Sequence, residues 1–180
     1  REINRFPGVY FGYNGNPDLR ANTWKEAFLK IIESVLEDAA RKNVVFDFSY
    51  EDIRAAIQKH APALEEITSP CLVHWDAWNP NFFVKDGKIN GIIDFERALW
   101  AEPLMEAQFR QFFNEDISNS MRGYGKTSFT HAEAQRNHLY SLHLALVMHT
   151  ECFYRHYDTD DVFNFSRQLI AATMSWLQAN

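Results

Sequence analysis

The chain has 180 residues, which is enough for one ordinary globular domain and too few for two. Hydrophobic residues make up 46%, so the chain can bury a sizeable core and is not expected to be disordered. The net charge of −6, with no long basic run, argues against a nucleic-acid partner, because phosphate binding needs concentrated Lys and Arg. No apolar stretch approaches the roughly 18 residues of a membrane-spanning helix.

The two cysteines, Cys71 and Cys152, lie far apart and neither has a Cys-x-x-Cys partner, so no zinc or redox motif is predicted. Two buried, reduced thiols favour a cytoplasmic protein. The chain begins without Met, and no apolar signal region follows its first residues. We therefore expect a cytoplasmic protein with no membrane partner, whose chain starts within a longer sequence.

The N-terminal third is predicted to be a loop followed by two helices. Residues 1–22 are rich in Pro, Gly and Asn turn signals and are expected to be loop. A helix is expected from the cap at Thr23 to about Lys42, and a second, capped by Ser49, from Tyr50 to His60. The first is supported by apolar residues at helical spacing, namely Trp24, Phe28, Ile31, Ile32, Val35 and Leu36.

The centre of the chain has the pattern of short strands. Cys71–Val73 is a short apolar strand, and the runs Asn81–Lys85 and Lys88–Ile93 are separated by Asp86 and Gly87. An Asp-Gly pair between two apolar runs predicts a β-hairpin, because its type I′ turn needs positive φ at both positions. The loop before this hairpin and the residue after it are therefore expected to lie close together.

The C-terminal half is predicted to be mostly helical. Thr130 and Glu133 form a capping box, in which the side chain of each residue accepts a hydrogen bond from the backbone N–H of the other. The expected elements are a helix from Glu102–Pro103 through Phe109, Phe112 and Phe113, a loop from Asn119 to Thr127 that contains two glycines, a helix from the capping box to about Tyr157, and a last helix from about Asp160 to Leu177.

The polar residues of the centre form a pattern suited to phosphoryl transfer. His74-Trp75-Asp76, four residues and then Asn81 has the spacing of the kinase loop His-Arg-Asp-x-x-x-x-Asn, with Trp75 in the Arg position. Asp94 ends the second hairpin strand, where the kinase metal ligand is expected. The reaction needs a carboxylate that orients and deprotonates a hydroxyl, and oxygen ligands for Mg²⁺. The hairpin is expected to bring Asn81 and Asp94 together on one metal.

The segment His74–Arg110 resembles the aminoglycoside phosphotransferase family, which also includes choline kinases and fructosamine kinases. The loop His74–Asn81 has the family's His-x-Asp-x-x-x-x-Asn form, and Ile93–Glu96 resembles its Ile-Asp-Trp/Phe-Glu strand end. Ala101–Pro103 resembles the Gly-Asp-Pro-like turn that follows, and Glu106 resembles the acidic start of the next helix. The resemblance extends less specifically over the helices on both sides. It implies an α+β, mostly α, fold: the large lobe of a protein kinase, with a small β-hairpin that bears the catalytic and metal residues.

The resemblance also implies roles for the matching residues. Asp76 is expected to be the catalytic base, and His74 a member of the catalytic loop that braces the backbone near Asp94. Asn81 and Asp94 are expected to bind Mg²⁺ and, through it, ATP or GTP. The reaction is expected to be phosphoryl transfer to a hydroxyl of a small molecule.

The parts of a kinase that hold the nucleotide from above are not found in the sequence. No Gly-x-Gly-x-x-Gly loop followed by a strand Lys is present, so we expect this chain to be the large lobe alone and inactive by itself. Its partner would be the missing N-terminal lobe of the same protein. The expected divisions are a loop over 1–22, helices over 23–60, the catalytic loop and metal hairpin over 71–97, and a substrate-side helical region over 102–180.

The acceptor is expected to lie against the helices after the metal strand. Glu115, Asp116, Glu151, Tyr154 and Asp158 are the candidate residues there. Carboxylates and aromatic faces would suit a cationic acceptor such as an amino sugar or choline. The alternative is that these residues form a solvated helix face.

Two other functions remain open at this point. One is a non-catalytic kinase-like module used for binding or scaffolding, which is disfavoured because Asp76, Asn81 and Asp94 are all present. The other is a metal-dependent hydrolase that uses His74 and Asp76. It is disfavoured because no second His stands at ligand spacing and Asn is a poor zinc ligand.

Overall fold

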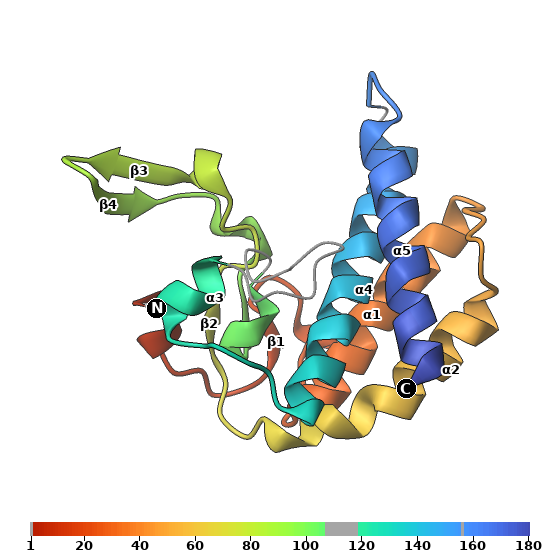
Figure 1. Ribbon diagram of the computed structural model, residues 1–180, viewed down its shortest axis with the longest axis horizontal. Coiled ribbons are helices and arrows are strands. Elements are labelled where there is room, and N and C mark those ends of the chain that lie inside the picture. The colour runs from red at the N-terminus through yellow and green to blue at the C-terminus, as the bar shows by residue number, and fades with distance from the viewer. Residues whose placement is uncertain (1, 107–118, 156) are drawn as a thin grey trace.

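The computed structural model describes residues 2–106, 119–155 and 157–180. Four long helices form one side of the molecule, and two small sheets lie on the other (Figure 1). No helix in these ranges is long and apolar enough to span a membrane. The four helices are α1 (Trp24–Arg41), α2 (Tyr50–His60), α4 (His131–Arg155) and α5 (Asp161–Ala179).

The helix caps confirm the predicted helix starts. The hydroxyl of Thr23 accepts from Glu26 N at the start of α1, and that of Ser49 accepts from Asp52 N at the start of α2. At α4 the capping box is complete, since Thr130 N donates to Glu133 Oε2 (2.8 Å) and Glu133 N donates to Thr130 Oγ1 (3.2 Å). Each cap satisfies backbone N–H groups that have no partner within the helix.

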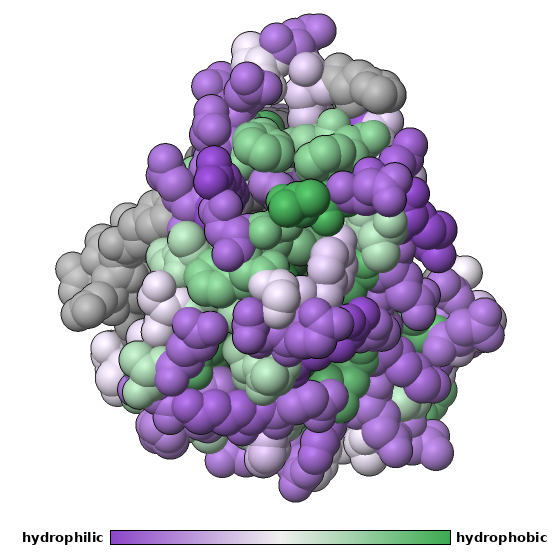
Figure 2. All heavy atoms as spheres, turned by 90° about the vertical axis from the view of Figure 1, so that its right-hand side faces the viewer, coloured by the Kyte–Doolittle hydropathy of each residue, from purple (hydrophilic) through white to green (hydrophobic). Residues whose placement is uncertain are grey.

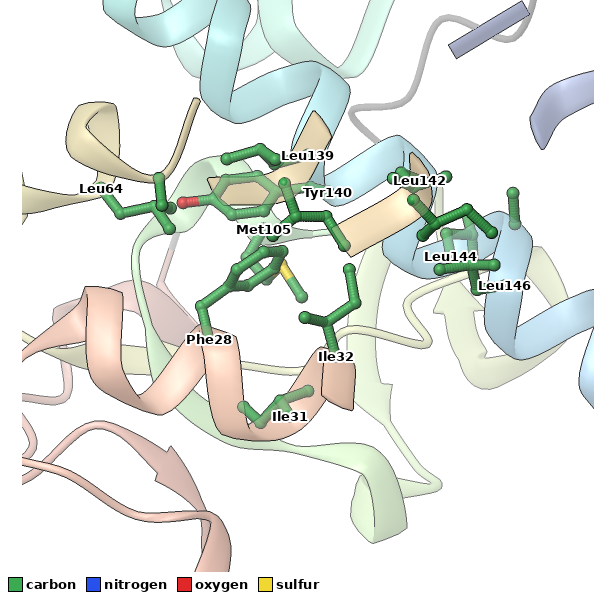
Figure 3. Packing of buried hydrophobic residues seen from close by; sticks show 14 of the residues in the cluster. Phe28, Ile31, Ile32, Leu64, Met105, Leu139, Tyr140, Leu142, Leu144 and Leu146 are labelled. Carbon is green, nitrogen blue, oxygen red and sulfur yellow. The ribbon is translucent and has the colours of Figure 1, made fainter. Parts of the chain in front are cut away.

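The core lies between α1 and α4 (Figure 3). Trp24 and Phe28 on α1 pack against Tyr140 on α4, with ring centroids 6.1 Å and 5.4 Å from the tyrosine ring. All three side chains are almost fully buried. Burial of each such side chain stabilises the fold by roughly 1.5–3 kcal/mol. Leu64 and Met105, from the segments that lead to and from the sheets, close the same core.

A three-stranded antiparallel sheet, not predicted from the sequence, lies beside this core. Its order is β1 (Gly12–Tyr13), β5 (Leu99–Ala101) and β2 (Cys71–Val73). Only β2 was expected, so the prediction of loop over residues 1–22 is wrong at β1. Strands of two and three residues are too short to show an alternating pattern of apolar residues. They form because the fold places a partner strand beside each of them.

The predicted hairpin is confirmed as β3 (Phe82–Lys85) and β4 (Lys88–Ile92). Its turn residues have the positive φ that a type I′ turn needs, 53° at Asp86 and 70° at Gly87. The hairpin extends away from the helices (Figure 1). Its open end therefore lies next to the catalytic loop, as the sequence indicated.

Two predicted elements differ in the structure. Residues Asn119–Tyr124 form helix α3 rather than a loop, and buried Met121 anchors it to the core. The helix ends in a Schellman motif at Gly125 (φ 97°), where Gly125 N donates to Arg122 O and Lys126 N to Met121 O. Its two glycines indicated a turn, but one lies inside the helix and only the other ends it.

The helix expected from Pro103 is also wrong at its start. Pro103–Met105 is a single 3₁₀ turn that ends at Glu106, where ψ is 125°. The rest of that predicted helix, Phe109, Phe112 and Phe113 included, lies outside the described residues. The predicted acceptor residues Glu115 and Asp116 lie outside them as well.

A buried ion pair joins α4 to the segment after β5. The guanidinium of Arg136 donates from Nε to Glu102 Oε1 (2.8 Å) and from Nη1 to Ala63 O (3.0 Å). Tyr140 also donates to Glu102, and Trp24 Nε1 donates to the hydroxyl of Tyr140 (2.6 Å). Both charged side chains are less than a tenth exposed. The network therefore fixes Glu102 against the helical core.

Replacing Arg136 by Ala is expected to lower the free energy of unfolding by about 3–5 kcal/mol, because it leaves a buried carboxylate without its cation. Urea denaturation followed by circular dichroism measures this change. The matched control is Lys25→Ala, which removes an ion pair to Glu65 whose carboxylate is 61% exposed. That variant should change the stability by less than about 1 kcal/mol. Equal losses in the two variants would contradict the argument.

Candidate active site

His74 joins the catalytic loop to the strand that carries Asp94. The imidazole is fully buried, and its Nε2 lies 2.8 Å from the carbonyl oxygen of Ile93. Because a carbonyl oxygen can only accept, this contact requires the hydrogen of the neutral ring to be on Nε2. The ring also packs edge-on against Phe95 at 4.5 Å between centroids. The expected contact of His74 with the backbone beside Asp94 is therefore present.

Glu106 holds the same loop from the opposite direction. Its two carboxylate oxygens accept the backbone N–H groups of His74 and Trp75, each at 3.0 Å. Burial raises the pKa of this carboxyl group, and the two backbone hydrogen bonds oppose the shift. The sequence placed Glu106 at an acidic helix start and indicated no contact for it. The two residues are 32 positions apart, and only folding brings them together.

Asp76 and Asn81 lie side by side at the end of the loop. The amide Nδ2 of Asn81 donates to the backbone oxygen of Asp76 (2.9 Å) and approaches its carboxylate Oδ2 (3.4 Å). Asn81 is buried, and the carboxylate of Asp76 is only partly exposed. The amide therefore orients the carboxylate that the sequence offers as a base.

Asp94 is presented on a strained turn directly after the hairpin. Ile93 N donates to Asn81 O (3.0 Å), which continues the strand pairing to the residue before Asp94. Asp94 itself is left-handed, with φ 69° and ψ 59°, and Trp75 also has positive φ, 67°. Such backbone costs about 1–3 kcal/mol at a non-glycine residue and gathers at functional sites. The two strained residues directly follow the two residues of the His74–Ile93 contact.

The oxygen atoms of Asn81 and Asp94 fit a magnesium ion. Both are hard donors, and within the described residues neither Asn81 Oδ1 nor the Asp94 carboxylate accepts a hydrogen bond. The described residues contain no cluster of three or more His, Cys, Asp and Glu side chains that could hold a metal. Mg²⁺ commonly takes only one or two protein ligands and completes its shell with water and substrate phosphates.

Arg97 is a further residue of the site that the sequence did not indicate. Its guanidinium lies 5.3 Å from the ring centroid of Trp75 and forms an ion pair with Glu151 on α4. Burial lowers the pKa of Arg97, but the Glu151 hydrogen bond and the charges of Glu151 and Asp76 raise it above its ordinary value. Arg97 therefore places a positive charge beside the catalytic loop. Its position directly after the Ile93–Glu96 motif was the only available signal.

The predicted acceptor residues on α4 do not gather in one place. Glu151 pairs with Arg97 and, at 3.7 Å, with Arg155. Tyr154 instead donates to Asp38 O on α1 (3.0 Å). Asp158 is exposed after the end of α4. Of the three, only Glu151 lies next to the catalytic loop, and its charge is already balanced.

A comparison with protein families adds to this geometry. The sequence matches the phosphotransferase enzyme family over residues 13–114, more than half of the chain. The chain belongs to this family. A comparison with curated proteins finds no matching sequence.

Solved phosphotransferase structures share the fold. A Haemophilus somnus 129PT protein assigned as a fructosamine-3-kinase superposes with a TM-score of 0.67 at 17% identity. The match covers 96% of this chain and 59% of that one. Aminoglycoside phosphotransferase APH(4)-Ia, in a ternary complex with AMP-PNP and hygromycin B, gives a TM-score of 0.60 at 18% identity. That match covers 85% of this chain and 52% of the other.

These likenesses show the fold, which is α+β, mostly helical and kinase-like, as the sequence predicted. The chain spans between half and three fifths of the length of these two structures.

Replacing Glu106 by Ala is expected to release the catalytic loop, because two buried backbone N–H groups lose their acceptor. The amide protons of His74 and Trp75 should exchange with solvent at least about tenfold faster, the effect of losing roughly 1.4 kcal/mol of hydrogen bonding. Hydrogen exchange measured by NMR tests this. Glu96→Ala, which removes an exposed carboxylate of the same region, is the control. Unchanged exchange at both amides in Glu106→Ala would show that this contact does not hold the loop.

Proposed function

We propose that the protein containing this chain transfers a phosphoryl group from ATP to a hydroxyl of a small molecule. The observation that carries the proposal is the arrangement of Asp76, Asn81 and Asp94 around one end of the hairpin. His74 and Glu106 hold the loop in that arrangement. The AMP-PNP bound by the structurally similar APH(4)-Ia supports a nucleoside triphosphate as the donor.

Asp76 acts in this proposal as the base. Its carboxylate accepts the hydrogen of the acceptor hydroxyl and aligns the oxygen for attack on the terminal phosphate. The contact with Asn81 Nδ2 restricts the orientation of the carboxylate. Since phosphoryl transfer depends mainly on positioning and charge, a fixed carboxylate at this place is the central requirement.

Asn81 and Asp94 would hold Mg²⁺ through their side-chain oxygens, which accept no hydrogen bond from the described residues. When bound, Mg²⁺ supplies charge that neutralises the phosphates of the nucleotide. The chain's own contribution is to hold two oxygen donors at adjacent ends of β3 and β4.

The acceptor is proposed to be a small hydroxyl compound. Glu151, the carboxylate that could attract a cationic acceptor, is paired with Arg97 and Arg155. An ammonium group would have to displace an arginine to reach that carboxylate. We therefore propose an uncharged acceptor, in place of the cationic one that the carboxylates and aromatic faces of this region suggested.

A second lobe is proposed to cover the nucleotide. The hairpin and the neighbouring loop expose large apolar side chains, which monomeric proteins rarely gather in the open. These are Trp78, Phe83, Val84, Ile89, Ile93 and Phe95. Together with the incomplete coverage of the solved relatives, they support an N-terminal lobe of the same protein as their partner.

Replacing Asp76 by Asn in the full-length protein is expected to lower kcat by about a hundredfold or more, the range for loss of a general base. ADP release in the presence of Mg²⁺ and a panel of hydroxyl acceptors measures the activity. The control is Asp86→Asn at the hairpin turn, where φ is 53° and Asn is well tolerated. Near-normal turnover of Asp76→Asn would refute the assignment of the base.

The 180-residue chain by itself is expected to bind ATP weakly or not at all, because the lobe that would enclose the nucleotide is not part of it. Isothermal titration with ATP or GTP and Mg²⁺ measures this, with the full-length protein as the comparison. A micromolar dissociation constant for the 180-residue chain would overturn the proposal that a second lobe is needed.

A further inference from the structure

A cavity of about 210 Å³ lies on the far side of α4 from the catalytic loop. It is lined by α4, α5 and the segment that joins α1 to α2, and it opens to the surface. Figure 2 shows this face of the molecule, where apolar side chains gather around a hollow and hydrophilic residues surround them. Phe46 and Ile170, both nearly buried, and the ring of Phe163 form the apolar walls. None of these residues takes part in the proposed reaction.

One buried imidazole, His149, supplies a polar atom to the cavity, and the charged side chains Asp47 and Arg167 line its rim. It is only 2% exposed, and its ring lies 5.4 Å from Phe46 and 4.5 Å from Phe163 between centroids. Nδ1 lies 3.0 Å from Ser166 Oγ, which itself donates to Phe163 O at 2.9 Å. With the Ser166 hydroxyl hydrogen donated to Phe163 O, the tautomer that completes the pair has its hydrogen on Nδ1. Nε2 is therefore the acceptor.

The surroundings of His149 disfavour a charged imidazole. Burial lowers the pKa of His149, and nearby Arg167 adds to that shift. Nearby Asp47 and a hydrogen bond to the backbone of Phe163 oppose it. Asp47 and Arg167 neutralise each other at the rim through two hydrogen bonds of 2.6 Å and 2.8 Å. In the described part of the chain, Nε2 has no hydrogen-bond partner. The cavity thus offers aromatic walls, one lone pair and no net charge.

We propose that this cavity binds a small neutral aromatic molecule that carries one O–H or N–H group, such as a phenol or an indole. The ring lies among Phe46, Phe163 and Ile170, and its hydrogen is donated to His149 Nε2. The volume agrees with this class, because an apolar cavity of roughly 150 Å³ takes up benzene and this one is larger. A charged ligand would find no unpaired partner at the rim.

The site is separate from the proposed active site although both use α4. His149 and Glu151 are two residues apart, so they point to different sides of the helix. Glu151 contacts Arg97 beside the catalytic loop, and His149 contacts Ser166 on α5. Binding in the cavity therefore needs neither ATP nor the second lobe, and it can be measured on this chain alone.

The test is a titration of the 180-residue chain with phenol and, separately, with benzene, followed by NMR. Phenol is expected to bind about fivefold more tightly than benzene, the effect of one hydrogen bond of roughly 1 kcal/mol. Contacts in nuclear Overhauser spectra should place phenol against Phe163 and Ile170. Absence of phenol binding at 10 mM, on the order of the weakest useful affinity, would overturn the proposal.

Two variants complete the experiment. His149→Phe keeps a ring in the wall and removes the acceptor, so phenol and benzene should bind equally well. His131→Phe, at the exposed start of the same helix, is the matched control and should keep the preference for phenol. A preference for phenol that persists in His149→Phe, or equal affinity for both probes in the unmodified chain, would overturn the proposal. The second result does not depend on the folding of any variant.

Discussion

Two buried glutamates, four residues apart, connect the helical core to the catalytic loop. Glu102 accepts from Arg136 and Tyr140 on α4, and Glu106 accepts the backbone N–H groups of His74 and Trp75. The segment between them follows β5, the central strand of the three-stranded sheet. Burying a carboxylate costs free energy unless hydrogen bonds satisfy its oxygens. Each glutamate therefore allows only a narrow range of positions for the groups that bind it. The position of the loop therefore depends on how α4 packs.

The loop needs this support because its backbone is strained. Trp75 and Asp94 both have positive φ, which free residues of these types rarely adopt. The His74 side chain spans the two, with Nε2 on the Ile93 carbonyl. Contacts on both sides of the loop offset the strain, and they place Asp94 where the hairpin ends. Preorganisation of this kind suits phosphoryl transfer, in which the protein mainly positions groups and charge.

Helix α4 serves both the proposed active site and the aromatic cavity. On one side Glu151 holds Arg97 over the ring of Trp75, which stands in the position that Arg occupies in the kinase loop. On the other side His149 holds Ser166. A guanidinium thus lies beside the loop although Trp75 stands at the arginine position of the loop itself. Since a helix turns about 100° per residue, neighbouring positions face different parts of the protein, and one helix can serve both.

The sequence by itself determined the elements that depend on local signals. The caps at Thr23 and Ser49, the Asp86-Gly87 turn and the spacing from His74 to Asn81 each act within a few residues, and the structure has the elements they predict. The family match agrees with the loop and the hairpin.

Tertiary structure alone decided the contacts between distant segments. The strand pairing of β1 and β5, the ion pair of Arg97 with Glu151 and the support of the loop by Glu106 join residues that are between 31 and 88 positions apart. No periodicity marks a three-residue strand or a single paired carboxylate. Such contacts form only when packing of α1 against α4 brings distant segments of the chain together. For this reason the residues around the acceptor could not be predicted from the sequence.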